Sequence, residues 1–392
     1  MAGGLIMQIY QADQIITENK VLKNAYLFVE AGKIKKIEEE ISEDEKAKLK
    51  NNITYFSGSK IIPGLIDIHT HGGLGYMAGI GGYKGLKKWS QFKIKHGVTN
   101  FLPTIGTTAF DGMKKTAADV RPLMKDQTSN IMGLHLEGPF FTEGKKKGAQ
   151  TPEYLLASFP AKYRDYIEAN SDIINYISID PAQKIAEEIT SFCNGLDIKI
   201  AAGHSEILYR DFTKIKNQGY RSIIHSFNGM VGLHHRNPGL AYAACMDQDL
   251  YAEIICDGIH VSYSMLELFF KLKDFRKIIL ITDSVLAAGL KAGRYKKHND
   301  IVLKVTEDGR VYNNNGNLAG STLTMDQALK NTVTNLEIPL IKAVQMAALN
   351  PAKLLGLADQ KGSLKVGKDA DFVILNNDLD VKATYIKGEK VF

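Results

Sequence analysis

Cysteine is scarce in this sequence, and no two cysteines have the spacing of a redox or zinc motif. Among 392 residues there are three, Cys193, Cys245 and Cys256, and none belongs to a C-x-x-C pair. An odd number without such spacing argues against both a disulfide framework and a zinc site built from thiolates. The same scarcity favours a reducing compartment, so we predict a cytoplasmic protein.

Long apolar runs and blocks of basic residues are also absent. No segment offers eighteen consecutive apolar residues, and the start, "MAGGLIMQIY", lacks the basic flank and long apolar core of a signal peptide. The net charge is +6, but the lysines are spread along the chain rather than clustered. We therefore expect no membrane and no nucleic acid as a partner, whereas a small anionic substrate fits this charge.

A regular alternation of short apolar runs and helical patterns fills the middle of the chain. Eight runs are predicted as strands: 64–71, 98–105, 131–138, 173–180, 198–204, 221–227, 252–258 and 277–283. Helical patterns such as 152–170 and 181–195 separate most of them, which favours a parallel sheet covered on both faces. Eight such units predict an α/β fold with a closed (β/α)8 TIM barrel. An open sheet would be expected to show a glycine-rich phosphate turn where this chain has "HTHGG".

The two ends of the chain show a different pattern. Residues 5–61 contain short alternating runs such as "AYLFVEAGKIKKI", and the tail after "KGSLKVGKDADFVIL" again indicates strands joined by turns. We predict a small β-sandwich domain built from residues 1–61 and 351–392, with the barrel domain, 62–350, inserted between them.

Residues that bind metals or carry protons fall at the carboxyl ends of the predicted strands. They are His69, His71, Glu137, His204, His225, Asp257 and Asp283. In a barrel these ends meet at one mouth, where the active sites of this fold lie. Glu137 stands inside the apolar stretch "IMGLHLEGPFF", where an unpaired buried charge would cost on the order of several kcal/mol. A metal cation would offset that cost, so the pattern predicts a metal site.

The types of these residues indicate hydrolytic chemistry. Imidazole and carboxylate ligands without thiolates suit zinc, iron or manganese, and Glu137, His204 and His225 would leave room for a water molecule. Asp283 is then the natural general base and acid. His69 and His71 either hold a second ion, bridged by Glu137, or orient loops and water without binding metal. His135 shares the strand face of Glu137 and is either a further ligand or a residue that holds the carboxylate.

Several motifs together resemble a known family. In order they are "PGLIDIHTHG", "HLEGPF", "AGHS", "HSFNGM", "HRNPG", "DGIH", "TDSVLAAG", "LAGSTLTM" and "NPAKLLGL". They cover nearly the whole chain and are similar to the amidohydrolase superfamily, within it to the deacetylases of amino-sugar phosphates. The resemblance implies a metal-dependent enzyme that hydrolyses the N-acetyl amide of N-acetylglucosamine 6-phosphate to glucosamine 6-phosphate and acetate, with one or two ions per subunit.

The resemblance also implies substrate contacts at matching positions. His260 in "DGIH" matches a residue that binds sugar hydroxyls, and Asn228 and Gly229 match a loop that meets the phosphate. Leu318, which opens "LAGSTLTM", is a further implied contact. Arg236 matches an arginine that reaches the phosphate across a subunit interface, which implies a homodimer; a guanidinium binds phosphate oxygens bidentately.

One departure from the family pattern affects the chemistry. The loop after "HLEGPF" ends in "KKKGAQ", so that Gln150 stands where the family has a histidine that binds and polarises the acetyl carbonyl. Gln150 must then perform this task with an amide donor, or another group performs it. Two alternatives remain open: a different amidohydrolase reaction, on a cyclic amide or another acetylated sugar phosphate, and a sugar-phosphate-binding regulator that has lost catalysis.

Overall fold

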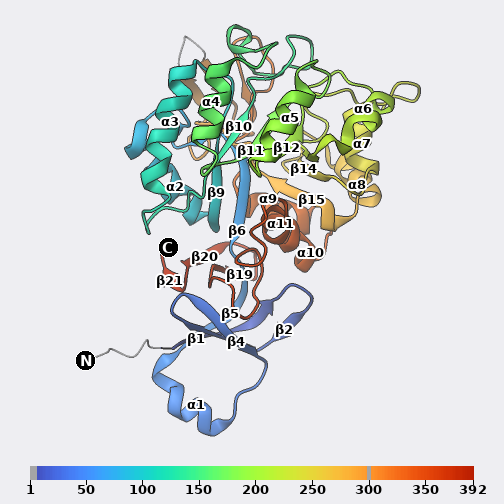
Figure 1. Cartoon of the computed structure of the whole chain (residues 1–392). Helices are drawn as coiled ribbons and strands as arrows, with labels where there is room; N and C mark the ends of the chain where they lie inside the picture. Colours follow the sequence, from blue (N-terminus) through green and yellow to red (C-terminus); the bar gives the residue numbers. More distant parts are fainter. Residues whose placement is uncertain (1–6, 298–301) are drawn as a thin grey trace.

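The middle of the chain forms a barrel of eight parallel strands (Figure 1). The computed structural model describes residues 7–297 and 302–392, so the first residues of "MAGGLIMQIY" lie outside the described part. The barrel strands are β6 (Leu65–Thr70), β9 (Val98–Ile105), β10 (Leu134–Glu137), β11 (Ile174–Ile179), β12 (Lys199–Ala202), β13 (Tyr220–Ile223), β14 (Tyr251–Ile255) and β15 (Ile278–Ile281). They are neighbours in sequence order, which confirms the eight predicted strands and the TIM barrel.

The barrel closes at a seam where its last strand, β15, meets its first strand, β6. Hydrogen bonds of the backbone and of side chains join the two strands there. The backbone N–H of Asp283 donates to the carbonyl of His69 at 2.9 Å. Below this bond the carboxylate of Asp67 accepts from the Thr282 hydroxyl and from the Lys93 ammonium, both at 2.6 Å. Asp67 and Lys93 are almost completely buried, so the seam of the barrel contains an ion pair inside the core.

Helices cover the outside of the barrel. They are α2 (Gly82–Lys95), α3 (Phe110–Leu123), α4 (Ala161–Ala169), α5 (Ala186–Gly195), α6 (Tyr209–Ile215), α7 (Leu240–Met246), α8 (Tyr263–Leu272), α9 (Met325–Thr334), α10 (Leu340–Val344) and α11 (Asn350–Leu354). The helix predicted over 152–170 is shorter than expected: a 3-10 turn, η2 (Pro152–Tyr154), is followed by α4 only from Ala161. Pro160 explains the break, because a proline excludes its preceding residue from the helical conformation.

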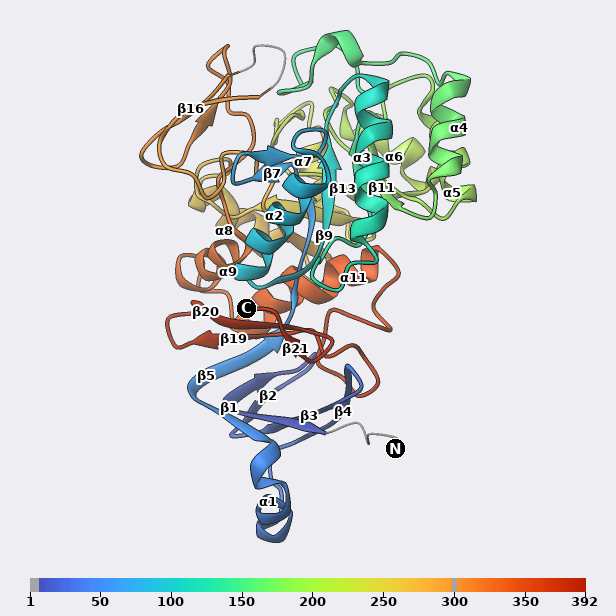
Figure 2. The same cartoon turned by 90° about the vertical axis from the view of Figure 1, so that its left-hand side faces the viewer.

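A second sheet combines both ends of the chain (Figure 2). It contains β1 (Gln8–Ile16), β2 (Val21–Lys23), β3 (Tyr26–Glu30), β4 (Lys33–Glu38), β5 (Ile53–Pro63), β19 (Phe372–Asn376), β20 (Val381–Ile386) and β21 (Glu389–Lys390). The C-terminal β19 pairs with the N-terminal β5, and side chains from both ends share one apolar core. The separate terminal sheet is confirmed; the domain boundaries 1–61, 62–350 and 351–392 stay a prediction.

The barrel mouth lies on the side away from the terminal sheet. Strand β5 leads directly into β6, which runs upward from the terminal sheet in Figure 1, so the carboxyl ends of the barrel strands are at the top. A hairpin, β7 (Gly72–Gly73) with β8 (Tyr76–Met77), and a small sheet of β16 (Gly293–Lys296), β17 (Val302–Val305) and β18 (Val311–Tyr312) pack together there. No helix in the described ranges has the length and apolar content needed to cross a lipid bilayer.

Candidate metal centre and active site

Three of the predicted site residues occupy equivalent places on their strands. His204, His225 and Asp283 each lie just beyond the carboxyl end of β12, β13 and β15, and their φ angles are 44°, 27° and 47°. Positive φ is uncommon for residues other than glycine and is found at functional sites, where the surrounding structure maintains it. The three side chains line the same cavity at the barrel mouth.

Glu137, His204 and His225 converge on one point. The Oε1 atom of Glu137 lies 3.0 Å from Nε2 of His204 and 3.1 Å from Nε2 of His225. The two Nε2 atoms are themselves 3.0 Å apart. All three side chains are buried. The predicted first ligand set is therefore brought together, with three potential ligand atoms around a common centre.

The hydrogen bonds around Glu137, His204 and His225 indicate that a metal cation, and not a shared proton, would lie between them. Nδ1 of His204 lies 2.9 Å from the carbonyl oxygen of Lys146, which only accepts, so Nδ1 carries the hydrogen and Nε2 presents a lone pair in the neutral ring. Burial lowers the pKa of His225, which favours its neutral form. Burial alone would raise the pKa of Glu137, but the histidines around it outweigh burial and hold the pKa well below its usual range. A carboxylate and two imidazole rings are ligands that suit zinc, iron or manganese.

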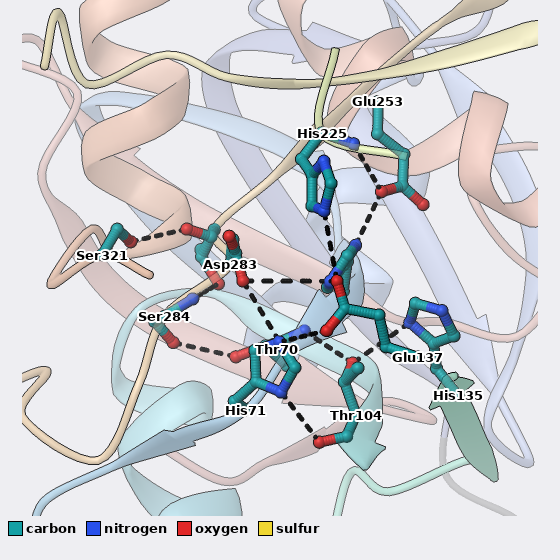
Figure 3. A network of polar contacts seen from close by, with 12 residues as sticks. Thr70, His71, Thr104, His135, Glu137, His225, Glu253, Asp283, Ser284 and Ser321 are labelled. Atoms are coloured by element: carbon teal, nitrogen blue, oxygen red, sulfur yellow. Dashed lines mark hydrogen bonds and ion pairs between the residues drawn. The ribbon is translucent and has the colours of Figure 1, made fainter. Parts of the chain in front are cut away.

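A second group contains His69, His71 and the same glutamate (Figure 3). Nε2 of His69 lies 3.5 Å from Oε1 of Glu137, and Nε2 of His71 lies 3.4 Å from Oε2. Nε2 of His69 is buried and has no hydrogen-bond partner among the described residues, as expected for an atom that faces a metal. The geometry thus offers a second position beside the first, with Glu137 shared between them.

Glu253 holds His69 from behind, and the sequence analysis did not identify it. Its Oε2 atom lies 2.8 Å from Nδ1 of His69 and accepts the backbone N–H of His225 at 3.2 Å; Figure 3 shows Glu253 beside His225. Its Oε1 atom accepts the hydroxyl of Tyr176 at 2.8 Å. Glu253 is fully buried in β14. A carboxylate behind a ligand histidine is a common feature of metal sites. The available signal was a glutamate inside the apolar run "AEIICDG", the same kind of signal as at Glu137.

His135 lies beneath both groups rather than in them. Its Nε2 atom is 2.6 Å from Oγ of Ser178, and its Nδ1 atom is 3.2 Å from Oγ1 of Thr104. Burial and the neighbouring His69 hold its pKa well below the usual range, so the ring is neutral. The ring packs edge-on against His69, with the ring centroids 4.6 Å apart. His135 is therefore placed to support the shape of the site through the His69 ring.

Asp283 is ionised and faces both histidines of the second group. Its Oδ1 atom lies 3.3 Å from Nε2 of His71 and 3.8 Å from Nε2 of His69. Burial would raise the pKa of Asp283, but the hydrogen bond from His71 and the charge of His69 outweigh it and lower the pKa to about 2. The hydrogen bonds of His71 to Asp283 and Glu137 likewise raise the pKa of His71 against the effect of its burial. Asp283 is therefore ionised at neutral pH, which is the protonation state that a general base requires.

A cavity of about 410 Å³ opens above these groups, and most of the predicted substrate contacts line it. They are Gln150, Asn228, Gly229, His260 and Leu318. Nε2 of His260 is buried without a hydrogen-bond partner in the described chain, and its Nδ1 atom lies 2.6 Å from Oδ2 of Asp257, which fixes the ring. Arg236 is different: it is exposed and is not among the residues that line this cavity.

Some of the cavity lining could not be assigned from the sequence. Lys297 follows β16, and Leu303 belongs to β17, so the small sheet inserted after β15 contributes one wall. The asparagine-rich segment 313–317 supplies further polar groups on that wall. Lys147, in the basic run that precedes Gln150, also lines the cavity.

Comparison with known proteins agrees with the fold. The pattern of the Amidohydrolase family matches residues 61–391. The chain belongs to this family. Within it, the chain is 32% identical over 334 residues to an N-acetylglucosamine-6-phosphate deacetylase of Vibrio furnissii, covering 85% of this chain and 83% of the relative. It is 31% identical to an N-acetylgalactosamine-6-phosphate deacetylase of Escherichia coli O157:H7, covering 97% of this chain and 98% of the relative.

Solved structures agree with this family assignment. The crystal structure of N-acetylglucosamine-6-phosphate deacetylase from Pasteurella multocida superposes with a TM-score of 0.89 at 30% identity, covering 98% of this chain and 99% of the other. The resemblance found in the sequence motifs is therefore confirmed over almost the full length of the chain.

Proposed function

We propose that this protein is a metal-dependent deacetylase that hydrolyses the N-acetyl amide of N-acetylglucosamine 6-phosphate to glucosamine 6-phosphate and acetate. The observation that carries the proposal is the convergence of Glu137, His204 and His225 beside the ionised Asp283 in one cavity. The names of the similar proteins support the substrate class.

The chemistry requires a divalent cation held by Glu137, His204 and His225, with His69 and His71 available for a second. Such an ion, zinc in first place and iron or manganese as alternatives, acts as a Lewis acid and lowers the pKa of a water ligand to about 7 in zinc enzymes. We propose one or two ions per subunit.

Asp283 moves the proton in this scheme. Its carboxylate accepts a proton from the attacking water and later donates it to the amide nitrogen as the carbon–nitrogen bond breaks. The bond between the acetyl carbon and nitrogen is replaced by a bond to the water oxygen, so that one water molecule is consumed and acetate is released. His71, at 3.3 Å from Oδ1, holds the carboxylate toward the reacting groups.

The cavity lining provides the substrate contacts. In our proposal Nε2 of His260 binds a sugar hydroxyl, and Asn228 with the backbone of Gly229 binds the phosphate. Leu318 lines the cavity beside the sugar, and Gln150 lies next to the acetyl group. Arg236 of the partner subunit completes the phosphate site in a homodimer, since this arginine lies outside the cavity of its own subunit.

Within this class of deacetylases, the substrate can be either the glucosamine or the galactosamine epimer of the sugar phosphate. One of the similar proteins acts, by its name, on N-acetylgalactosamine 6-phosphate. Acetate release should therefore be measured with both epimers and with unphosphorylated N-acetylglucosamine. We expect a clear preference for a phosphorylated sugar; a specificity constant that is unchanged without the phosphate would contradict the roles of Asn228 and Arg236.

The Asp283→Asn variant tests the mechanism. It keeps the size of the side chain but removes the base, so we expect kcat to fall by about 10²- to 10⁴-fold while metal content stays unchanged. Near-normal turnover in a metal-loaded variant would exclude Asp283 as the proton carrier. Tight binding of the substrate by the unmodified protein without acetate release would instead favour a regulator that has lost catalysis.

The location in the cell stays a prediction. All three cysteines are buried free thiols, in agreement with the reducing, cytoplasmic compartment inferred from their number.

A further inference from the structure

Both ends of the Gln150 side chain are bound to the protein. Its Nε2 atom donates to Oε2 of Glu137 at 2.7 Å. Its Oε1 atom accepts two hydrogen bonds from Thr107, one from the backbone N–H at 3.0 Å and one from the hydroxyl at 2.8 Å. Gln150 is only 8% exposed although it lines the cavity.

Thr107 determines which way the amide faces. The Thr107 hydroxyl accepts the backbone N–H of Thr151 at 2.9 Å, so its single hydrogen is left for Oε1 of Gln150. With two donors on one side, only the oxygen of the amide fits there, and the NH2 group must point to Glu137. Thr107 follows β9 and Gln150 lies on the loop after β10, so the contact links two neighbouring units of the barrel.

The two oxygens of Glu137 are thereby used differently. Oε1 faces His204 and His225, and Oε2 faces the amide of Gln150 and, at 3.4 Å, Nε2 of His71. Gln150 supplies the shorter of the two contacts at Oε2, and its loss would leave this oxygen with only the longer contact to His71.

We infer that Gln150, oriented by Thr107, is a positioning residue that holds Glu137 in the geometry that binds metal. This inference rests on the proposed metal-dependent function, but it assigns Gln150 a task different from gripping the acetyl carbonyl. Groups behind metal ligands typically change metal affinity by about 10- to 100-fold when they are lost.

The test is the metal dissociation constant, measured on the purified full chain by competition with a chelator for zinc. The Gln150→Leu variant keeps a similar shape and loses both hydrogen-bonding groups, so we expect zinc to bind about 10- to 100-fold more weakly. The Gln150→Glu variant keeps the acceptor for Thr107 but turns a carboxylate toward Oε2 of Glu137, and we expect a loss at least as large. A circular dichroism spectrum checks that each variant is folded.

Thr107 provides the graded controls. Thr107→Val removes the hydroxyl donor and should weaken zinc binding several-fold, whereas Thr107→Ser retains it and should restore binding to within about twofold of the original chain. Thr213→Val is the matched control, because its hydroxyl donates only to a carbonyl within α6 at the surface, and zinc affinity should not change.

Kinetics separate positioning from substrate contact. If Gln150 acts through Glu137, added zinc restores most of the kcat of Gln150→Leu with little change in KM. A raised KM that added zinc does not correct, with unchanged zinc affinity in both Gln150 variants, would overturn the inference and make Gln150 a substrate contact. If the original chain binds no divalent ion, the proposed function fails; if it binds zinc and the Gln150 variants bind it equally well, only the positioning role fails.

Discussion

Glu137 is the residue on which the site depends most. Its two carboxylate oxygens lie within 3.5 Å of one nitrogen from each of His69, His71, His204 and His225. The sequence indicated this glutamate because a carboxylate stood in an apolar strand, and the positions of its partners followed from the geometry of a barrel. The sequence did not indicate how each histidine is oriented, because the groups behind the rings come from strands far apart in the chain.

Glu253 gives a test of that orientation. Replacing Glu253 with Ala removes the acceptor behind His69 and leaves a buried N–H without a partner, so we expect about 10- to 100-fold weaker metal binding. Glu253→Gln retains an acceptor oxygen of the same shape and should lose less. The metal content per subunit is measured by elemental analysis after dialysis at a fixed zinc concentration. It should be lowest in Glu253→Ala and intermediate in Glu253→Gln.

A selective effect is expected if two ions bind. Glu253 contacts the ring of His69 in the second ligand group but only the backbone N–H of His225 in the first, so Glu253→Ala should lose the second ion more readily than the first. Equal metal content in Glu253→Ala and the original chain would contradict the role we give to Glu253.

The barrel strands were the part of the fold that the sequence predicted best. Each lies in a short apolar run that ends in polar residues, and all eight were found at their predicted places. The small sheet β16–β18 was not predicted, because its strands are only two to four residues long and pack on a loop at the mouth rather than on the barrel core. The cavity wall that this sheet provides was missed for the same reason.

The seam between β6 and β15 should be decisive for the stability of the barrel. Lys93 is buried on α2, and burial lowers its pKa against the attraction of Asp67. Replacing Lys93 with Met leaves the carboxylate of Asp67 buried without its cation, so we expect a loss of about 3–5 kcal/mol in the free energy of unfolding. Chemical denaturation followed by circular dichroism measures this loss.

Lys87 on the same helix is the matched control. It pairs with Asp126 at 2.8 Å near the surface, so Lys87→Met should cost much less stability than Lys93→Met. A Lys93→Met variant as stable as Lys87→Met would show that the seam does not depend on the buried ion pair.

The carboxyl ends of the barrel strands, where the site lies, are on the side away from the terminal sheet (Figure 1). Arg236 is exposed at the surface. A site that takes Arg236 from a second subunit predicts complementation between two inactive variants. Arg236→Ala lacks the arginine that it would supply, and Asp283→Asn lacks the base. In a mixed dimer the intact Asp283 of one subunit meets the intact Arg236 of the partner subunit, so one complete site forms.

Equal amounts of the two variants, mixed and allowed to exchange subunits, should therefore regain about a quarter of the original activity, because half of the dimers are mixed and each has one complete site. Size-exclusion chromatography with light scattering should show a dimer. A mixture no more active than the sum of its separate components would place Arg236 outside the partner's site.

The most direct test of the account is the rate of acetate release from N-acetylglucosamine 6-phosphate before and after removal of divalent ions. The account predicts that exhaustive chelation abolishes turnover and that adding back zinc, manganese or ferrous iron restores it while the fold stays intact. A chelated protein, verified to be metal-free, that releases acetate at its original rate would contradict the central claim that Glu137 and its histidines form a catalytic metal site.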